Sequence, residues 1–350
     1  MRLTAFFHPL ATLASVTMLA ALTLAGCGGT TPARPDAGTQ PPLSSSAPPV
    51  RIGIALGGGA AKGFAHIGVI KMLEANGFAP AVVSGTSAGS VVGALYASGM
   101  NAFEMQEKAV ALDEAKIRDL QLSSGGLVLG QKLEDYVNEQ VRRKPLEQMA
   151  KPFVVVATRL EDGERTVFAR GNTGQAVRAS SSVPGVFQPV TIGKYHFVDG
   201  GIVSPVPVDA ARQLGADIVI AVDISNKARG QTPGDMLGTL GQSIAIMGQK
   251  LGQAELARAD VIIRPQVLDI GSADFSQRTN AILEGEKAAL AVMPQIRERV
   301  AQLQAERANA ARAAQQKAAE AQYQTCLEKR SSLQKLAGMA RLDDSCTAPK

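Results

Sequence analysis

The sequence predicts an α/β protein with a mainly parallel, doubly wound sheet, helices on both faces and a helical C-terminal extension. Short apolar runs at 51–56, 82–84, 153–158 and 218–222 are typical of buried strands. These runs alternate with longer segments whose apolar residues recur at helical spacing, which is the pattern of parallel strands joined by helical crossovers. With 350 residues and 45% hydrophobic content, the chain can enclose a large core.

The first 49 residues are expected to stay outside this core. A largely apolar run, 5–24, follows Arg2 and predicts an export signal. Leu24-Ala25-Gly26-Cys27 resembles the lipobox of bacterial lipoproteins, which implies removal of residues 1–26 and lipidation of Cys27. Gly28 stands where such proteins carry an inner-membrane retention aspartate, so the resemblance implies the outer membrane, facing the periplasm. An ordinary cleaved signal is the alternative. Residues 27–49, rich in Gly, Pro, Ser and Thr, predict a flexible tether.

A glycine loop at 57–63 follows the first strand and precedes a helix expected over 64–76. A phosphate-binding loop would need Ser or Thr directly after Lys62, where Gly63 stands. A dinucleotide site would need an acid at the end of the next strand, which instead ends in Ser84-Gly85. The remaining interpretations are an oxyanion hole formed by bare backbone amides, and a glycine turn for close packing of strand and helix.

The next strand leads into Gly85-Thr86-Ser87-Ala88-Gly89, which has the form of a nucleophile elbow centred on Ser87. At such a sharp strand-to-helix turn the neighbouring chain passes very close, so Gly85 and Gly89 avoid clashes that a Cβ would cause. The following helix directs its N-terminal amides towards the serine. A tight turn packed under a helix is the non-catalytic interpretation. Since parallel strands share one carboxyl edge, Ser87 and the glycine loop are expected there together.

Asp199-Gly200-Gly201 follows a strand predicted at 195–198. With the glycine loop, the elbow and the stretch 179–187, these residues make 50–264 resemble the patatin-like phospholipases. The resemblance implies that Ser87 is the nucleophile and Asp199 its general base. It also implies that the amides around Gly58, Gly59 and Ala60 form the oxyanion hole. Many members carry glycine where this chain has Ala60, which leaves the shape of that hole open.

Histidines offer an alternative to this serine–aspartate dyad. Of the three histidines, His8 leaves with the signal, whereas His66 follows the glycine loop and His196 lies in the strand before Asp199. Either could complete a Ser-His-Asp triad. No cofactor and no metal site are expected, because none of the three cysteines has ligand spacing. Few aromatic residues and no dense basic run argue against nucleic-acid binding.

The rest of the chain is expected to complete the hydrolytic domain over 50–294 and a helical Ala-, Gln- and Arg-rich extension over 295–350. A hairpin turn is predicted at 161–164. Cys326 and Cys346 could form a disulfide in an oxidising periplasm. Helices are predicted at the following positions: 101–122, 131–143, 205–214, 235–257 (amphipathic through Leu240, Ile244, Met247 and Leu251) and from 277 onward.

Together these features predict a lipid-anchored serine acyl hydrolase of the phospholipase A or lysophospholipase type, with membrane lipids as both substrate and anchor. The first alternative is a generic carboxylesterase or thioesterase. The second is a non-catalytic envelope lipoprotein that uses the fold as a scaffold.

Overall fold

The computed structural model describes residues 48–350 except 118, 124–125, 226–233, 338–345, 347 and 349–350. The predicted signal, Cys27 and nearly all of the predicted tether therefore lie outside the described residues. In the part of the chain that is described, no helix has both the length and the apolar character needed to cross a membrane.

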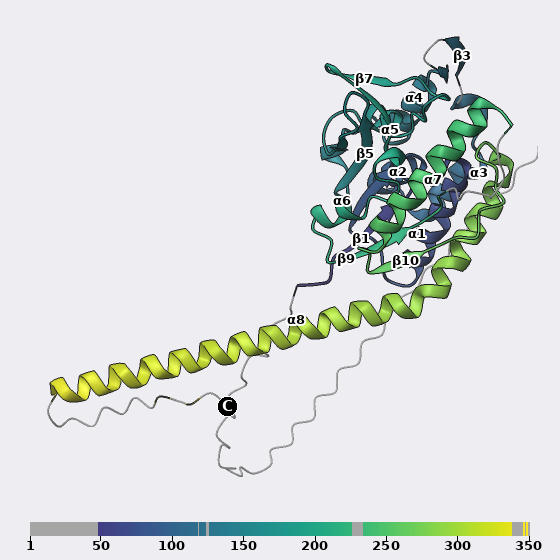
Figure 1. The fold of residues 1–350 in the computed structure, drawn as a ribbon. Helices are drawn as coiled ribbons and strands as arrows, with labels where there is room; N and C mark the ends of the chain where they lie inside the picture. Colours follow the sequence, from purple (N-terminus) through teal and green to yellow (C-terminus); the bar gives the residue numbers. More distant parts are fainter. Residues whose placement is uncertain are drawn as a thin grey trace, which may run out of the picture. The chain divides into compact units, whose positions relative to one another are not determined.

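An eight-stranded sheet forms the centre of the fold (Figure 1), in the order β10-β9-β1-β2-β5-β8-β7, with β6 also paired to β5. Five neighbouring strands are parallel: β10 (Val261–Ile263), β9 (Ile218–Val222), β1 (Ile52–Leu56), β2 (Val82–Thr86) and β5 (Phe153–Arg159). Three pair antiparallel: β6 (Arg165–Phe168), β7 (Val190–Ile192) and β8 (Tyr195–Asp199). The α/β prediction is confirmed, and the sheet is mixed because short turns join β5 to β6 and β7 to β8, which permits only antiparallel pairing.

Helices cover both faces of the sheet (Figure 1). The larger core packs β1 side chains such as Ile54 and Leu56 against five helices. These are α1 (Ala65–Ala75), α2 (Ala88–Ala97), α3 (Ala102–Val110), α4 (Gln131–Gln140) and the first part of α8 (Arg278–Ala337). α5 (Thr173–Ser180) joins the same core through Ala176 and Val177. On the opposite face, Ala55 and Val219 pack against α6 (Val208–Gln213) and Leu256 at the end of α7 (Met236–Leu256).

The helix predicted over 101–122 is much shorter than expected. A capping box between Asn101 and Glu104 begins α3, but the helix ends at Val110. The Asp113 side chain then accepts the amide of Ala115, a local hydrogen bond that competes with helix continuation. A short 3₁₀ turn and a two-stranded ribbon follow, formed by β3 (Leu120–Ser123) and β4 (Gly126–Val128).

The helix α8 continues without interruption across the predicted domain boundary at 294/295. Ile296 and Val300, which lie beyond that boundary, are still buried in the larger core. After Leu303 the described side chains of α8 are mostly exposed, as expected for the extension. Cys326 and Cys346 form the predicted disulfide, with 6.0 Å between their Cα atoms.

Candidate active site

Ser87 lies at the turn between β2 and α2, where the sequence predicts a nucleophile elbow. β1 and β2 are parallel and Leu56 pairs with Gly85, so the glycine loop and Ser87 leave the same edge of the sheet. The backbone of Ser87 has φ 52° and ψ −124°, a conformation that residues other than glycine rarely adopt. Such a strained backbone persists only where the surrounding structure holds it in place, and here the close contacts at the neighbouring glycines do this.

Close chain crossings explain the glycines around the elbow. A Cβ on Gly89 would lie 2.1 Å from the carbonyl oxygen of Leu56, and one on Gly85 would lie 2.6 Å from the Gly89 oxygen. The predicted steric role of both glycines is therefore confirmed. Gly200 has the same role beside the aspartate, because its Cβ would lie 2.2 Å from the Val156 oxygen. No larger residue fits at these three positions without moving backbone.

The structure brings Ser87 and Asp199 together across 112 residues of sequence. The Ser87 hydroxyl donates a hydrogen bond of 2.6 Å to Asp199 Oδ2, and both residues are buried. The second carboxylate oxygen, Oδ1, accepts the amide of Gly201 at 2.7 Å. The backbone of Asp199 is fixed as well, because its carbonyl accepts the Thr158 hydroxyl at 2.8 Å. Rotation of the carboxylate away from the serine would break the hydrogen bond to Gly201.

Burial makes the Asp199 carboxylate an unusually strong base for its type. Desolvation raises the pKa of Asp199 from 3.8 to about 6, and the hydrogen bonds from Ser87 and Gly201 only partly oppose this. At neutral pH the carboxylate is therefore still largely ionised. It accepts a proton more readily than an exposed aspartate would, which is the property that a general base requires.

Ser180, at the end of α5, is a site residue to which the sequence analysis gave no role. Its hydroxyl oxygen accepts the backbone amide of Ser87 at 2.8 Å. The same hydroxyl donates to the carbonyl of Val156 in β5 at 2.5 Å. Ser180 thus ties the strained elbow to the neighbouring strand. The stretch 179–187 contributes to the family resemblance, but nothing in its spacing indicates this contact.

The glycine loop offers two of the three predicted oxyanion donors in the observed conformation. The Gly58 amide donates to the Pro205 carbonyl at 3.0 Å, so it is already engaged. Within the described part of the chain, the amides of Gly59 and Ala60 donate to no backbone acceptor. Ala60 has φ 52°, a conformation that glycine would adopt more easily. Ala88 begins α2, where amides have no acceptor within the helix, and it is a further candidate donor.

Neither remaining histidine is hydrogen-bonded to the serine–aspartate pair among the described residues. His66 is buried and its Nε2 donates to the Gly57 carbonyl at 2.8 Å. Burial lowers the pKa of His66 to about 4, so the ring is neutral. His196 is exposed and its Nδ1 lies 2.8 Å from Glu161 Oε1. The Ser87 hydroxyl thus has a carboxylate and no imidazole as its hydrogen-bond partner among the described residues.

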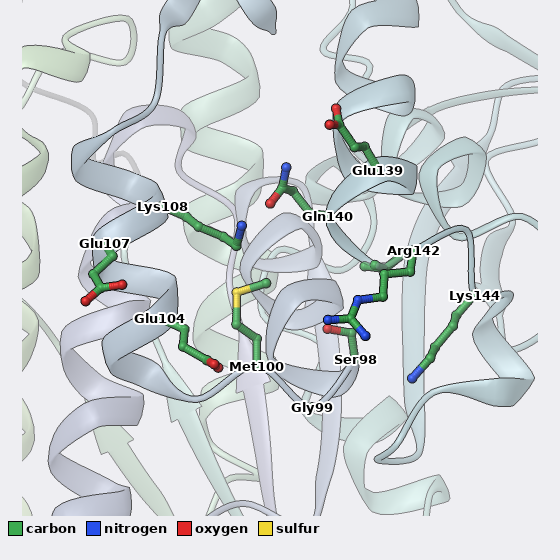
Figure 2. Close-up of a pocket in the computed structure, with 11 residues that line it drawn as sticks. Ser98, Gly99, Met100, Glu104, Glu107, Lys108, Glu139, Gln140, Arg142 and Lys144 are labelled. Carbon is green, nitrogen blue, oxygen red and sulfur yellow. The ribbon is translucent and has the colours of Figure 1, made fainter.

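A separate hollow of about 540 Å³ lies at the ends of α2, α3 and α4 (Figure 2), and neither Ser87 nor Asp199 lines it. Figure 2 shows Met100 near the middle of the lining residues and Ser98 beside Arg142, with other charged side chains around them. Its lining includes three carboxylates and three cations: Glu104, Glu107, Glu139, Lys108, Arg142 and Lys144. This balance of charge gives no preference for an anionic or a cationic ligand.

The fold is thus of the α/β class, with a strained serine at the carboxyl edge of the sheet hydrogen-bonded to a buried aspartate. Residues 54–212 of this chain match the family model described as patatin-like phospholipase. The predicted resemblance to this family is therefore confirmed over that part of the chain. An uncharacterized NTE family protein of Mycobacterium tuberculosis is 35% identical over 188 residues, which cover 53% of this chain and 52% of that protein.

Other similar proteins include lysophospholipase NTE1 of Pyricularia oryzae, 30% identical over 181 residues that cover 50% of this chain and 12% of that protein. The solved heterodimeric complex ExoU–SpcU of Pseudomonas aeruginosa aligns with 85% of this chain and 68% of the matched chain. Its TM-score is 0.42 at 17% identity. The chain thus spans about half the length of the mycobacterial relative and a much smaller part of the fungal one.

Proposed function

We propose that this protein is a serine acyl hydrolase that cleaves lipid esters, of the phospholipase A or lysophospholipase type. The observation that carries the proposal is the 2.6 Å hydrogen bond from Ser87 to the buried carboxylate of Asp199. The patatin-like phospholipase match and the relative named a lysophospholipase support a lipid ester as the substrate class. The fold alone would not support assignment of a substrate class, because one fold serves many functions.

The proposed reaction has two halves. In the first, Ser87 Oγ attacks the acyl carbonyl carbon while Asp199 takes the hydroxyl proton. The ester C–O bond then breaks, and the leaving alcohol takes that proton. In the second half, Asp199 accepts a proton from water, the water attacks the acyl-serine, and the fatty acid leaves as Ser87 is reprotonated. The amides of Gly59 and Ala60, with the N-terminus of α2, stabilise the oxyanion in both halves.

Covalent labelling with a fluorophosphonate probe tests the nucleophile directly. We expect the wild-type chain to be labelled at Ser87 and Ser87→Ala to remain unlabelled. Asp199→Asn should react roughly 10³-fold more slowly, because the base is lost. Ser98→Ala, which changes another serine of the same region, should label like wild type. Equal labelling of the wild type and Ser87→Ala would refute the proposal and favour the non-catalytic scaffold.

Product analysis separates the lipid hydrolase from the generic esterase or thioesterase. The wild-type chain and Ser87→Ala would be incubated with phospholipid, lysophospholipid, a soluble p-nitrophenyl ester and an acyl thioester. Mass spectrometry should detect free fatty acid from the lipids only with the wild-type chain. Turnover confined to the soluble ester or the thioester would support the alternative.

Histidine variants test the dyad against a Ser-His-Asp triad. His66→Gln and His196→Gln should each keep substantial turnover, since neither histidine contacts the serine. His196→Gln is the cleaner test because its ring is exposed, whereas His66 supports the glycine loop. A loss near 10³-fold in His196→Gln would contradict the dyad.

The envelope location also belongs to this proposal. Cys27 is the lipidated residue, residues 27–49 are the tether, and the hydrolytic domain works at the outer membrane facing the periplasm. The proposal is supported by the lipobox-like Leu24-Ala25-Gly26-Cys27. Metabolic labelling with an alkyne fatty acid should mark the wild-type protein and not Cys27→Ala. Labelling that persists in Cys27→Ala would refute this anchor.

A further inference from the structure

The helix α7 carries an apolar stripe on its exposed side. Met236, Leu240, Met247 and Leu251 follow each other at helical spacing, and each is exposed, from 40% for Leu240 to 83% for Met236. On a helix of 3.6 residues per turn these four side chains fall within about 60° of arc. We call this set the α7 stripe. Isolated exposed apolar residues are common, but an aligned row marks an interaction surface.

Towards the segment 200–206, α7 presents small and polar residues, and among its described side chains only Leu256, at its end, is both apolar and buried. A Cβ on Gly248 would lie 3.7 Å from the Gly201 carbonyl, and one on Gly252 would lie 3.4 Å from Pro205. At the end of the helix, buried Glu255 accepts the Ser204 hydroxyl and the Val206 amide. Small residues therefore let α7 lie close to the segment 200–206, while the four apolar residues of the α7 stripe face outward.

This inner contact places the α7 stripe next to the candidate active site. Gly201, which faces Gly248, is also the residue whose amide holds Asp199 Oδ1. In the sequence α7 follows β9, whose carboxyl end lies at the same edge of the sheet as the carboxyl ends of β1 and β2, where Ser87 lies. A surface that engages the α7 stripe would consequently lie beside the serine–aspartate pair.

The size and charge of the α7 stripe favour a lipid surface over a second protein chain. Its side chains expose roughly 400 Å², about half of what each partner buries in a stable protein–protein interface. A bilayer sets no such minimum, because partly buried apolar side chains enter the headgroup region individually. Between 236 and 254 the only charged residue is Lys250. That stretch therefore carries no carboxylate for anionic headgroups to repel.

We infer that α7 is the membrane-docking element of this protein, and that its stripe enters the headgroup region of a phospholipid bilayer beside the active site. The inference rests on the proposed function for its purpose, which is delivery of lipid esters to Ser87. Docking itself is a property of the surface and does not require turnover. Its test can therefore fail or succeed independently of the hydrolase proposal.

An environment-sensitive dye tests where α7 lies. Met247→Cys and the control Leu290→Cys would each be labelled in the full chain, with the unsubstituted chain giving the background. Leu290 is a matched site because it is an apolar helical residue with 50% exposure, compared with 48% for Met247, and α8 covers the other face of the sheet. Vesicles of phosphatidylethanolamine and phosphatidylglycerol at 3:1 should shift the emission of the dye at 247 to the blue. The emission at 290 should not change.

Two results would overturn the inference. One is equal emission at 247 and 290 in the presence of vesicles. The other is a blue shift at 247 that appears without vesicles and grows with protein concentration, which would assign the stripe to a second copy of the chain. Repeating the measurement in Ser87→Ala should give the same shift as in the active chain, because docking precedes chemistry.

A turnover experiment links docking to substrate. Leu240→Glu/Met247→Glu should lower hydrolysis of the same vesicles at least tenfold and change hydrolysis of a soluble p-nitrophenyl ester less than twofold. The control pair Leu283→Glu/Leu290→Glu, on α8, should leave both rates within twofold of wild type. Unchanged vesicle turnover in the first pair would overturn the inference, and so would an equal loss on both substrates, because α7 would then act through folding.

Discussion

Replacing Asp199 by asparagine should make the protein more stable while it removes activity. The carboxylate is buried, and burial raises its pKa from 3.8 to about 6, so folding makes ionisation of this group less favourable. Asparagine has nearly the same shape. Its oxygen can accept the Gly201 amide and its nitrogen can donate to Ser87, so both hydrogen bonds of the carboxylate have replacements.

The magnitude follows from the change in pKa. A tenfold change in proton affinity corresponds to about 1.4 kcal/mol, so the rise to about 6 costs about 3 kcal/mol of stability when the group is ionised in both states. Below pH 3.8 both states are protonated and no penalty exists. Between pH 3.8 and 6 the unfolded chain loses its proton first, so the stability contributed by this group falls as pH rises. Above pH 6 the penalty is complete and constant.

Urea unfolding followed by circular dichroism at pH 4, 6 and 8 tests this reasoning. Asp199→Asn should exceed wild type by about 3 kcal/mol at pH 8 and by less than about 1 kcal/mol at pH 4. Asp209→Asn is the control, for which we expect a change in stability of the opposite sign. Its ion pair with Arg258, 2.7 Å long, lowers the pKa of Asp209, so removal of that carboxylate should destabilise the protein near neutral pH. A stability gain for Asp199→Asn that is the same at pH 4 and pH 8 would refute the argument.

Three further predictions concern the same site. The pH dependence of kcat/KM should show activity rising through an apparent pKa near 6, because Asp199 must be ionised to act as base; a flat profile from pH 5 to 8 would contradict that role. Ser180→Ala should lower turnover of a soluble ester roughly tenfold by freeing the Ser87 amide, whereas Ser182→Ala, whose hydroxyl donates to the Arg178 carbonyl, should not. Gly89→Ala should lose more than about 3 kcal/mol or fail to fold, while Gly241→Ala, with open space around its Cβ, should melt at or above the wild-type temperature.

The elements that the sequence predicted best are those fixed by local sterics. Gly85 and Gly89 could be assigned a role from the sequence because a strand-to-helix turn around a serine leaves no space for a Cβ, whatever the rest of the fold does. The meeting of Ser87 with the glycine loop followed from the rule that parallel strands share a carboxyl edge. Both predictions needed only neighbouring residues and one topological rule.

The features that the sequence did not predict depend on contacts between distant segments. The Gly58 amide could not be excluded as an oxyanion donor, since its acceptor, Pro205, is 147 residues away and the sequence predicts it within a helix over 205–214, whereas α6 begins only at Val208. The contact between the Ser180 hydroxyl and the Ser87 amide could not be predicted for the same reason, because 93 residues separate the two. The spacing of Leu240 and Met247 correctly predicted an amphipathic helix, but periodicity does not reveal which side faces the protein. That choice depends on contacts with the segment 200–206, which α7 makes through Gly248, Gly252 and Glu255.

The segment 200–206 connects the groups to which these predictions apply. Its Gly201 amide holds the base, and its Pro205 carbonyl holds the Gly58 amide at the start of the glycine loop. The Ser204 carbonyl accepts a hydrogen bond from the hydroxyl of Thr86, the residue before Ser87. The hydroxyl of Ser204 donates to Glu255 at the end of α7. Asp199, the glycine loop, the end of β2 and the proposed docking helix therefore all hydrogen-bond to the same seven residues. Because each partner constrains that segment, the fold sets the positions of Ser87, Asp199 and the glycine loop relative to α7.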